Sequence, residues 1–187
     1  MVNVLELVNY LLYLDREKSK LDGEDASPDI TLLKLQKLLY YCQGYSLGLF
    51  GEPLFEESIE AWEHGPVVVS VYNRYRSIGS LRISFEEKVE PKIDEHAKKI
   101  AQIVMQDKGR FSGWALRDMT HKEKPWNYTY YNLGRNSVIK ETIIQEFFTS
   151  TFDLELSPED EEAMFIDAGT SPTPQEWCEI NRHVSSI

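Results

Sequence analysis

The chain has 187 residues, of which 42% are apolar and 27% are charged, and its net charge at pH 7 is −11. This composition is that of a soluble globular protein, and the length allows one domain to bury a core without disulfides or metal. The negative charge argues against nucleic acid as the main ligand, because neutralising phosphates requires a basic surface.

The charge is unevenly distributed along the chain. Residues 151–187 hold nine acidic residues and one arginine, a net charge of −8, whereas residues 1–150 hold 22 acidic and 19 basic residues, a net charge of −3. Such an acidic segment either keeps a protein soluble or binds a basic partner, and solubility is the simpler interpretation. We therefore divide the chain into a domain, residues 1–150, and an acidic C-terminal extension, residues 151–187.

The first expected element is a helix from Asn3 to about Lys18. Its apolar run is too short and too interrupted to span a bilayer, and no positively charged stretch precedes it, so we expect neither membrane insertion nor a targeting signal. The two cysteines, Cys42 and Cys178, are far apart in the sequence. We interpret both as reduced thiols of a cytoplasmic protein. The candidate inner residues of this first helix are Leu5, Val8, Leu12 and Tyr13, with Leu7, Leu11 and Leu14 on a second apolar side.

The most apolar stretch of the chain predicts a buried helix over residues 31–50. Apolar residues recur at steps of three and four over so wide a face that the helix should be covered on most sides. Thr31 is the expected N-cap, because its hydroxyl can accept an unpaired backbone N–H, and Gly51 is expected to end the helix. Three tyrosines of this helix should fill the core with their hydroxyls at its edge: Tyr40, Tyr41 and Tyr45.

A compact connection over residues 52–63 follows, in which residues 59–62 could pair briefly as a strand. Gly65-Pro66 predicts the start of a second helix that reaches about Ile78, because proline at the first helical position lacks only an N–H that would be unpaired anyway. Residues 79–91 are expected to form a loop or a short edge hairpin. Residues 93–108 predict an amphipathic helix that ends at Gly109.

Three further segments complete the predicted elements. Ser112 is expected to cap a short helix that carries Trp114, Leu116 and Met119. Residues 120–136 are dense in aromatics and are predicted to be irregular, a kind of segment that is usually functional or packed by its own side chains. Ser137 is expected to cap a helix over Val138–Ser150, and the acidic extension has two capped helix starts, at Ser157 and at Thr173.

These elements predict a mainly α fold. It should be a compact single-domain helical bundle of about six core helices, with room for one small β-hairpin, followed by the acidic C-terminal helical extension.

The residues that could carry chemistry form no recognisable catalytic or metal-binding pattern. His64 precedes Gly65-Pro66 and could act as a base or a ligand, but a histidine that simply forms the turn is the better interpretation. His121 and Glu123 could form an acid–base pair or hold a metal, yet the four histidines are widely spaced and zinc-ligand spacing is absent. We therefore predict no catalytic residue, no cofactor and no metal ion.

Aromatic and basic residues offer a surface for a partner instead. Tyr128, Tyr130 and Tyr131 are interface candidates within residues 120–136, because aromatic side chains are enriched at protein interfaces. With Lys122 and Lys124 they could also stack nucleic acid bases, which the acidic balance of the chain disfavours.

A second basic group lies earlier in the chain. Arg74 and Arg76 could share a patch with Lys34 and Lys37, although an ordinary solvated helix face explains these four residues as well. The candidate partner-binding residues of the whole chain are therefore Trp62, His64, Tyr72, Arg74, Arg76, His121, Lys122, Glu123, Trp126, Tyr128 and Tyr130.

Two sequence blocks resemble a known family. The segment Leu32–Tyr72, LLKLQKLLYYCQGYSLGLFGEPLFEESIEAWEHGPVVVSVY, resembles the signature of the Panacea domain, the SocA-like antitoxin domain also found in phage-associated proteins. The segment Leu116–Trp126, LRDMTHKEKPW, resembles the second block of the same family. Two blocks in the right order, about fifty residues apart, make a specific match. The resemblance covers roughly residues 2–148 and does not cover the acidic extension.

The resemblance implies an antitoxin of a type II toxin–antitoxin system, which neutralises a cognate protein toxin by binding it directly and is not an enzyme. One alternative is a proteolytic adaptor that delivers a toxin to a AAA+ protease, as the SocA branch of the family implies. A second alternative, from the residues alone, is a small hydrolase or nucleotide-binding enzyme that uses His64, His121 and Glu123. The identity of the toxin and the oligomeric state cannot be read from the sequence.

Overall fold

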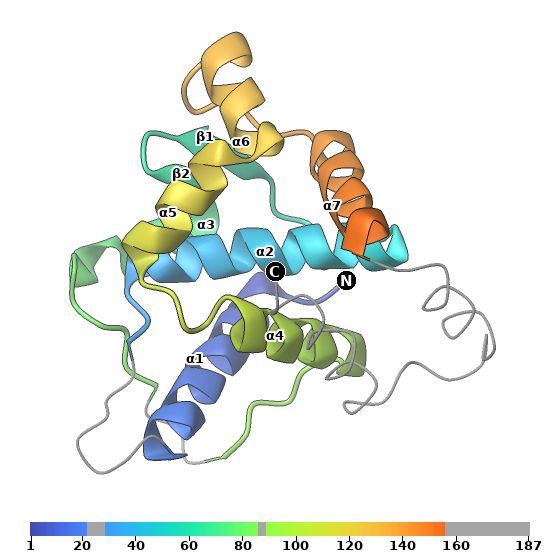
Figure 1. Cartoon of the computed structure of the whole chain (residues 1–187). Coiled ribbons are helices and arrows are strands. Elements are labelled where there is room, and N and C mark those ends of the chain that lie inside the picture. Colours follow the sequence, from blue (N-terminus) through green and yellow to red (C-terminus); the bar gives the residue numbers. More distant parts are fainter. Residues whose placement is uncertain (22–28, 86–88, 156–187) are drawn as a thin grey trace, which may run out of the picture.

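The computed structural model describes residues 1–21, 29–85 and 89–155 and is mainly helical (Figure 1). Its longer helices are α1 (Val4–Leu21), α2 (Leu32–Phe50), α4 (Glu95–Asp107), α5 (Gly113–Lys122) and α7 (Glu141–Glu155). Its shorter elements are α3 (Val69–Tyr75), α6 (Lys124–Tyr128), the 3₁₀ turn η1 (Arg76–Ile78), the π turn η2 (Thr129–Leu133) and the strands β1 (Ile59–Trp62) and β2 (Gly65–Val68). The predicted fold class, a mainly α bundle with one small antiparallel hairpin, is confirmed for the described residues.

Helix α2 runs through the middle of the molecule, as its broad apolar face predicts. α1 and α4 lie on one side of it, the hairpin, α5 and α6 lie on the other, and α7 packs against its C-terminal half (Figure 1). Fifteen of its nineteen residues are buried. Both predicted ends are confirmed: the Thr31 hydroxyl accepts the backbone N–H of Lys34 at 3.3 Å, and Gly51 ends the helix at φ +70°.

Two glycines let α7 approach α2 closely. A Cβ at Gly48 would lie 2.7 Å from the Cβ of Phe148 and 2.9 Å from the ring of Phe152. A Cβ at Gly44 would overlap the ring of Phe148 itself. Three tyrosine rings of α2 surround the Phe148 ring, with centroid distances between 5.6 and 6.1 Å: Tyr40, Tyr41 and Tyr45.

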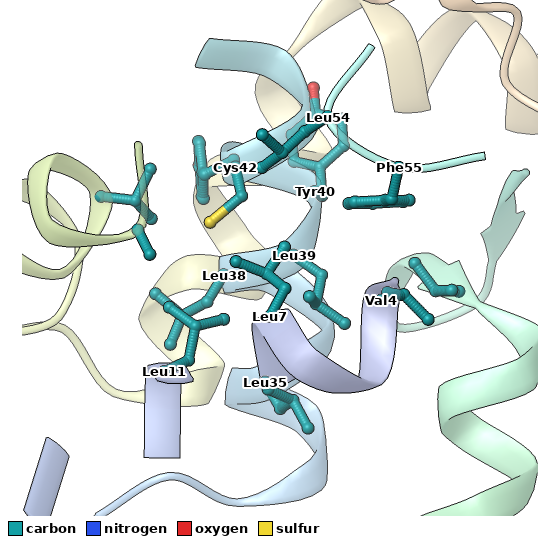
Figure 2. Packing of buried hydrophobic residues seen from close by; sticks show 14 of the residues in the cluster. Val4, Leu7, Leu11, Leu35, Leu38, Leu39, Tyr40, Cys42, Leu54 and Phe55 are labelled. Carbon is teal, nitrogen blue, oxygen red and sulfur yellow. The ribbon is translucent and has the colours of Figure 1, made fainter. Parts of the chain in front are cut away.

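The apolar core on the other side of α2 joins it to α1. Leu7 and Leu11 are fully buried and lie next to the leucines of α2 (Figure 2). Leu5, predicted among the inner residues, is 36% exposed, so the inner face of α1 is rotated relative to the predicted one. The backbone N–H of Val2 donates to the carbonyl of Leu54 at 2.8 Å, which ties the start of the chain to the connection after α2. The core residues that Figure 2 labels are Val4, Leu7, Leu11, Leu35, Leu38, Leu39, Tyr40, Cys42, Leu54 and Phe55.

The prediction that a helix begins at Pro66 is wrong, because α3 begins three residues later. Residues 59–62 form the predicted strand, and β2 pairs with it in antiparallel register, with Ala61 opposite Pro66. Gly65, at φ +95°, adopts the turn conformation that glycine tolerates best, and the valines that follow favour a strand. Pro66 fits in the strand because Ala61 directs its N–H and C=O away from β2, toward residues 136–137, so no ladder bond is lost.

The region after α5 is more regular than predicted. Residues 120–136 complete α5 and then form α6 and η2, because Trp126 and Tyr130 turn inward at helical spacing and bury the apolar side of these short helices. Ser137 does not cap a helix: its backbone carbonyl accepts the N–H of Ala61, and Ile139 donates to Ile59, so residues 137–139 extend the hairpin. Helix α7 therefore starts later than predicted, and it ends five residues beyond the predicted Ser150.

The predicted helix starts at Ser157 and Thr173, and Cys178, lie outside the described residues. Cys42 is a buried free thiol, as predicted. Among the helices that the structure describes, none combines the length and the apolar character needed to cross a bilayer.

Candidate partner-binding site

Most of the predicted site residues lie on one part of the molecule, formed by the hairpin, α3, α5, α6 and η2, which we call the hairpin–α5 face. Trp62, next to the hairpin turn, packs against Tyr72 of α3 with ring centroids 4.9 Å apart. The indole N–H of Trp126 donates to the carbonyl of Trp62 at 2.9 Å. This hydrogen bond joins the two sequence blocks across 64 positions, so the fold brings together residues that the sequence keeps apart.

A stack of three rings supports this face. His121 lies flat on Trp126, with centroids 3.6 Å apart and planes 12° apart, and Trp126 stacks on Tyr130 at 4.6 Å and 18°. The guanidinium of Arg135 lies 5.6 Å from the centroid of the Tyr130 ring, within the range of a cation–π contact. Trp126 is 1% exposed and Tyr130 is 9% exposed. The stack therefore fixes α5 relative to η2 and gives the face a rigid base.

His121 is held in its neutral form. Burial, together with the positive charges of Arg117 and Lys37, lowers the pKa of His121 from 6.5 to about 4. A histidine with this pKa is a poor proton donor at neutral pH. Across the part of the chain that the structure describes, no group of three or more metal-ligating residues is found.

We expect His121 to make stability depend on pH. Between pH 6.5 and about 4 the unfolded chain binds a proton at this residue and the folded chain does not, so this contribution to stability is lost as the pH falls. His121→Phe keeps a ring on Trp126 and removes the titration, so its urea midpoint should fall less than that of the wild type between about pH 7 and about pH 5. Equal losses in the two proteins would contradict this assignment.

Glu123 is turned toward α2. One carboxylate oxygen accepts the hydroxyl of Tyr40 and the other accepts the hydroxyl of Tyr41, each at 2.8 Å. Burial raises the pKa of Glu123, and it also raises the pKa of both tyrosines. Within the described residues no hydrogen bond joins Glu123 to His121.

Other predicted candidates lie at the surface. His64 is exposed at the hairpin turn, and Tyr128 is 43% exposed. His64 has a neighbour that sequence reasoning missed, Trp114, whose ring lies 5.7 Å away and which is 61% exposed. The buried positions Leu116 and Thr120 mark the inner face of α5, and a residue two positions before Leu116 points away from it. The remaining exposed candidates are Arg74, Arg76 and Lys122.

The two lysines assigned to a solvated helix face are buried, which corrects that prediction. Lys34 is 1% exposed and Lys37 is 0% exposed. Because α2 is covered on nearly every side, its lysines lie in the interior and need partners there. The Lys34 ammonium contacts the carboxylate of Asp29 at 2.7 Å, and the Lys37 nitrogen donates to the carbonyl of Pro66 at 2.8 Å.

Residues 35–127 match the family model described as "Antitoxin SocA-like, Panacea domain". This segment, just under half of the chain, is therefore similar to the SocA-like Panacea domain. The matched segment runs from α2 to α6 and contains the hairpin, α3 and α5, and so most of the hairpin–α5 face. Comparisons with curated proteins and with solved structures give no significant match.

Proposed function

We propose that this protein is the antitoxin of a type II toxin–antitoxin pair and that it neutralises its toxin by direct binding through the hairpin–α5 face. The match to the SocA-like antitoxin family carries this proposal. The surroundings of Glu123 and His121, the two residues that could have formed an acid–base pair, also favour binding over catalysis. Glu123 uses both carboxylate oxygens within the fold, and His121 is neutral and stacked.

Exposed aromatic side chains over a rigid base support the choice of this face. Trp114 is 61% exposed, Tyr131 is 69% exposed and Tyr128 is 43% exposed. Tyr131 stands edge-on to the buried Trp126 at 5.9 Å, so it is held on the ring stack. Aromatic residues that are already held in place lose little entropy on binding, and they often carry most of the binding energy of an interface.

Co-expression of the tagged protein with the product of the adjacent gene tests the proposal. Antitoxin activity predicts a stable complex in a pull-down and rescue of growth. Growth rescue with a falling toxin level and without a stable complex would favour the AAA+ protease adaptor. If no complex forms and growth is not rescued, both functions are contradicted.

The contribution of the face can be measured on the same complex. We expect Trp114→Ala to weaken toxin binding about tenfold or more, because exposed tryptophans are frequent binding hot spots. Phe50→Ala is a matched control, since Phe50 is a 43% exposed aromatic at the C-terminal end of α2, away from Trp114. Isothermal calorimetry of both variants gives the two affinities. Equal affinities for these variants would place the interface elsewhere.

A further inference from the structure

The two buried lysines of α2 differ in the number of hydrogen-bond acceptors that surround them. The Lys34 ammonium has three acceptors, the two carboxylate oxygens of Asp29 at 2.7 and 2.9 Å and the carbonyl of Gly109 at 2.7 Å. Lys37 is fully buried, and among the described residues it has one acceptor, the carbonyl of Pro66. Burial, together with the charge of Arg117, lowers the pKa of Lys37 well below its ordinary value, because the charged form is costly to bury without an anion. The side-chain nitrogen carries more N–H groups than this one acceptor uses. Lys37 thus has capacity to donate that the fold does not use.

Helix α5 places two more donors beside Lys37. It runs along α2, with Gly113 against the backbone of Lys34 and Glu123 against the tyrosines one to two turns further on. Arg117 and His121 lie between these two contacts, and both interact electrostatically with Lys37. The Nε of Arg117 and the Nε2 of His121 are buried and have no hydrogen-bond partner.

Gln36 adds a fourth group from α2. Its side-chain oxygen accepts the N–H of Val68 at 2.7 Å, and its Nε2 is buried without a partner. Gln36 is 2% exposed, so this amide is well over nine-tenths buried. Three of the four buried side-chain atoms that lack a partner in the described residues therefore belong to this junction of α2, α5 and β2, and the fourth is the hydroxyl of Thr129.

Gly65 allows the hairpin turn to pack closely against these groups. A Cβ at this position would lie 2.8 Å from the Lys37 nitrogen and 2.9 Å from the hydroxyl of Thr120. The hydroxyl of Thr120 donates to the carbonyl of Arg117, and it is neutral, so it supplies no negative charge to this group. The carboxylate of Asp118 acts on this group, and it accepts a hydrogen bond from the far end of the Arg117 guanidinium at 2.7 Å.

We propose that the α2–α5–β2 junction is an oxyanion-binding site, in which Lys37, Gln36, Arg117 and His121 donate to a carboxylate or phosphate group. Each of these four side chains can donate a hydrogen bond, and the guanidinium of Arg117 is cationic, which is the arrangement that an oxyanion satisfies. A bound oxyanion would also favour the charged form of Lys37. The contrast with Lys34 supports this assignment, because the same helix gives its other buried lysine a carboxylate. The inference does not depend on the proposed antitoxin function.

The ligand would enter from the α5 side. Lys37 and Gln36 form the inner wall, whereas Arg117 has a 30% exposed side chain and His121 is only half-buried. These two side chains form the outer wall, next to the exposed His64 and Trp114. Access past two movable side chains suits a small head group: either the carboxylate of an acidic side chain on a protein partner or the phosphate of a free ligand.

The test uses the full chain alone, so its outcome is independent of any toxin. The imidazole signals of His121, assigned with His121→Gln, are followed by NMR while sodium phosphate or sodium acetate replaces sodium chloride at constant ionic strength. We expect a saturable shift with one of the two anions. Arg117→Gln should weaken this binding about tenfold, since it removes a charged donor. Arg76→Gln, the same change at an exposed arginine outside the junction, should leave it unchanged.

The two anions distinguish the sources of the ligand. Saturation by phosphate supports a phosphate-bearing ligand, and saturation by acetate supports a carboxylate from a partner protein. The absence of saturation with both anions, or equal binding by Arg117→Gln and Arg76→Gln, would overturn the proposal. A non-specific effect of the salts on the protein would act on all variants alike and would not saturate. Arg117 is partly exposed, so its variant should fold even if changes at Lys37 do not.

Discussion

Gly44→Ala is expected to lower the free energy of unfolding by about 1–3 kcal/mol, the usual cost of adding a methyl group to a packed core. In an isolated helix the same change would stabilise by about 1 kcal/mol, because alanine is the better helix former. The direction reverses here because the new Cβ would lie 2.5 Å from Cδ2 and 2.6 Å from Cζ of Phe148. Urea unfolding of the variant and the wild type measures the difference.

A second substitution tests the cause. Phe148→Leu shortens the side chain that meets Gly44 and should cost stability by itself. In the double variant the added methyl group has room, so the combined loss should be smaller than the sum of the two single losses by about 1 kcal/mol. Additive losses would show that the methyl group is not opposed by the Phe148 ring.

Glu123→Ala is expected to cost about 2–5 kcal/mol of stability, because it leaves the hydroxyls of Tyr40 and Tyr41 without their acceptor in a buried position. Glu123→Gln keeps one acceptor oxygen and should cost about half as much. Denaturant unfolding of both variants gives these values.

The tyrosines provide the control for this prediction. Adding Tyr40→Phe and Tyr41→Phe to Glu123→Ala removes the unpaired hydroxyls and should restore part of the lost stability. A triple variant no more stable than Glu123→Ala would contradict the role given to these hydrogen bonds.

The raised pKa of Glu123 also makes stability depend on pH. The stabilisation that comes from this raised pKa is present at low pH and is lost as the pH rises through the folded-state pKa of Glu123.

The sequence predicts best where structure is determined locally. The helix over residues 31–50 was predicted with both of its ends, because the cap at Thr31, the apolar spacing and Gly51 all lie within one segment. The helix start at Pro66 was wrong because the signal is ambiguous: proline suits a first helical turn and also a strand position that makes no ladder bond. Pairing with Ala61 decides between them, and that pairing depends on tertiary structure.

The candidate site was predicted in part for the same reason. The sequence indicated Trp62, His64 and Trp126 as candidate partner-binding residues, and the fold brings them together on the hairpin–α5 face. Their exposure could not be predicted, since Trp126 is buried whereas the unselected Trp114 is open to solvent. The burial of Lys34 and Lys37 also could not be predicted from the sequence, because a lysine on a helix is normally solvated. These two lysines are covered only by the arrangement of α2, α5 and β2.

The close contact between α2 and α7 has a consequence for how such a protein can be inherited and rearranged. The segment 35–127 that carries the family resemblance stops in α6, yet Phe148 of α7 packs onto Gly44 and Val2 is tied to Leu54. A recombination event that moved only residues 35–127 into another gene would leave this core open on two sides. We therefore expect the unit that can be exchanged as a working module to be longer than this signature and to include α1 and α7.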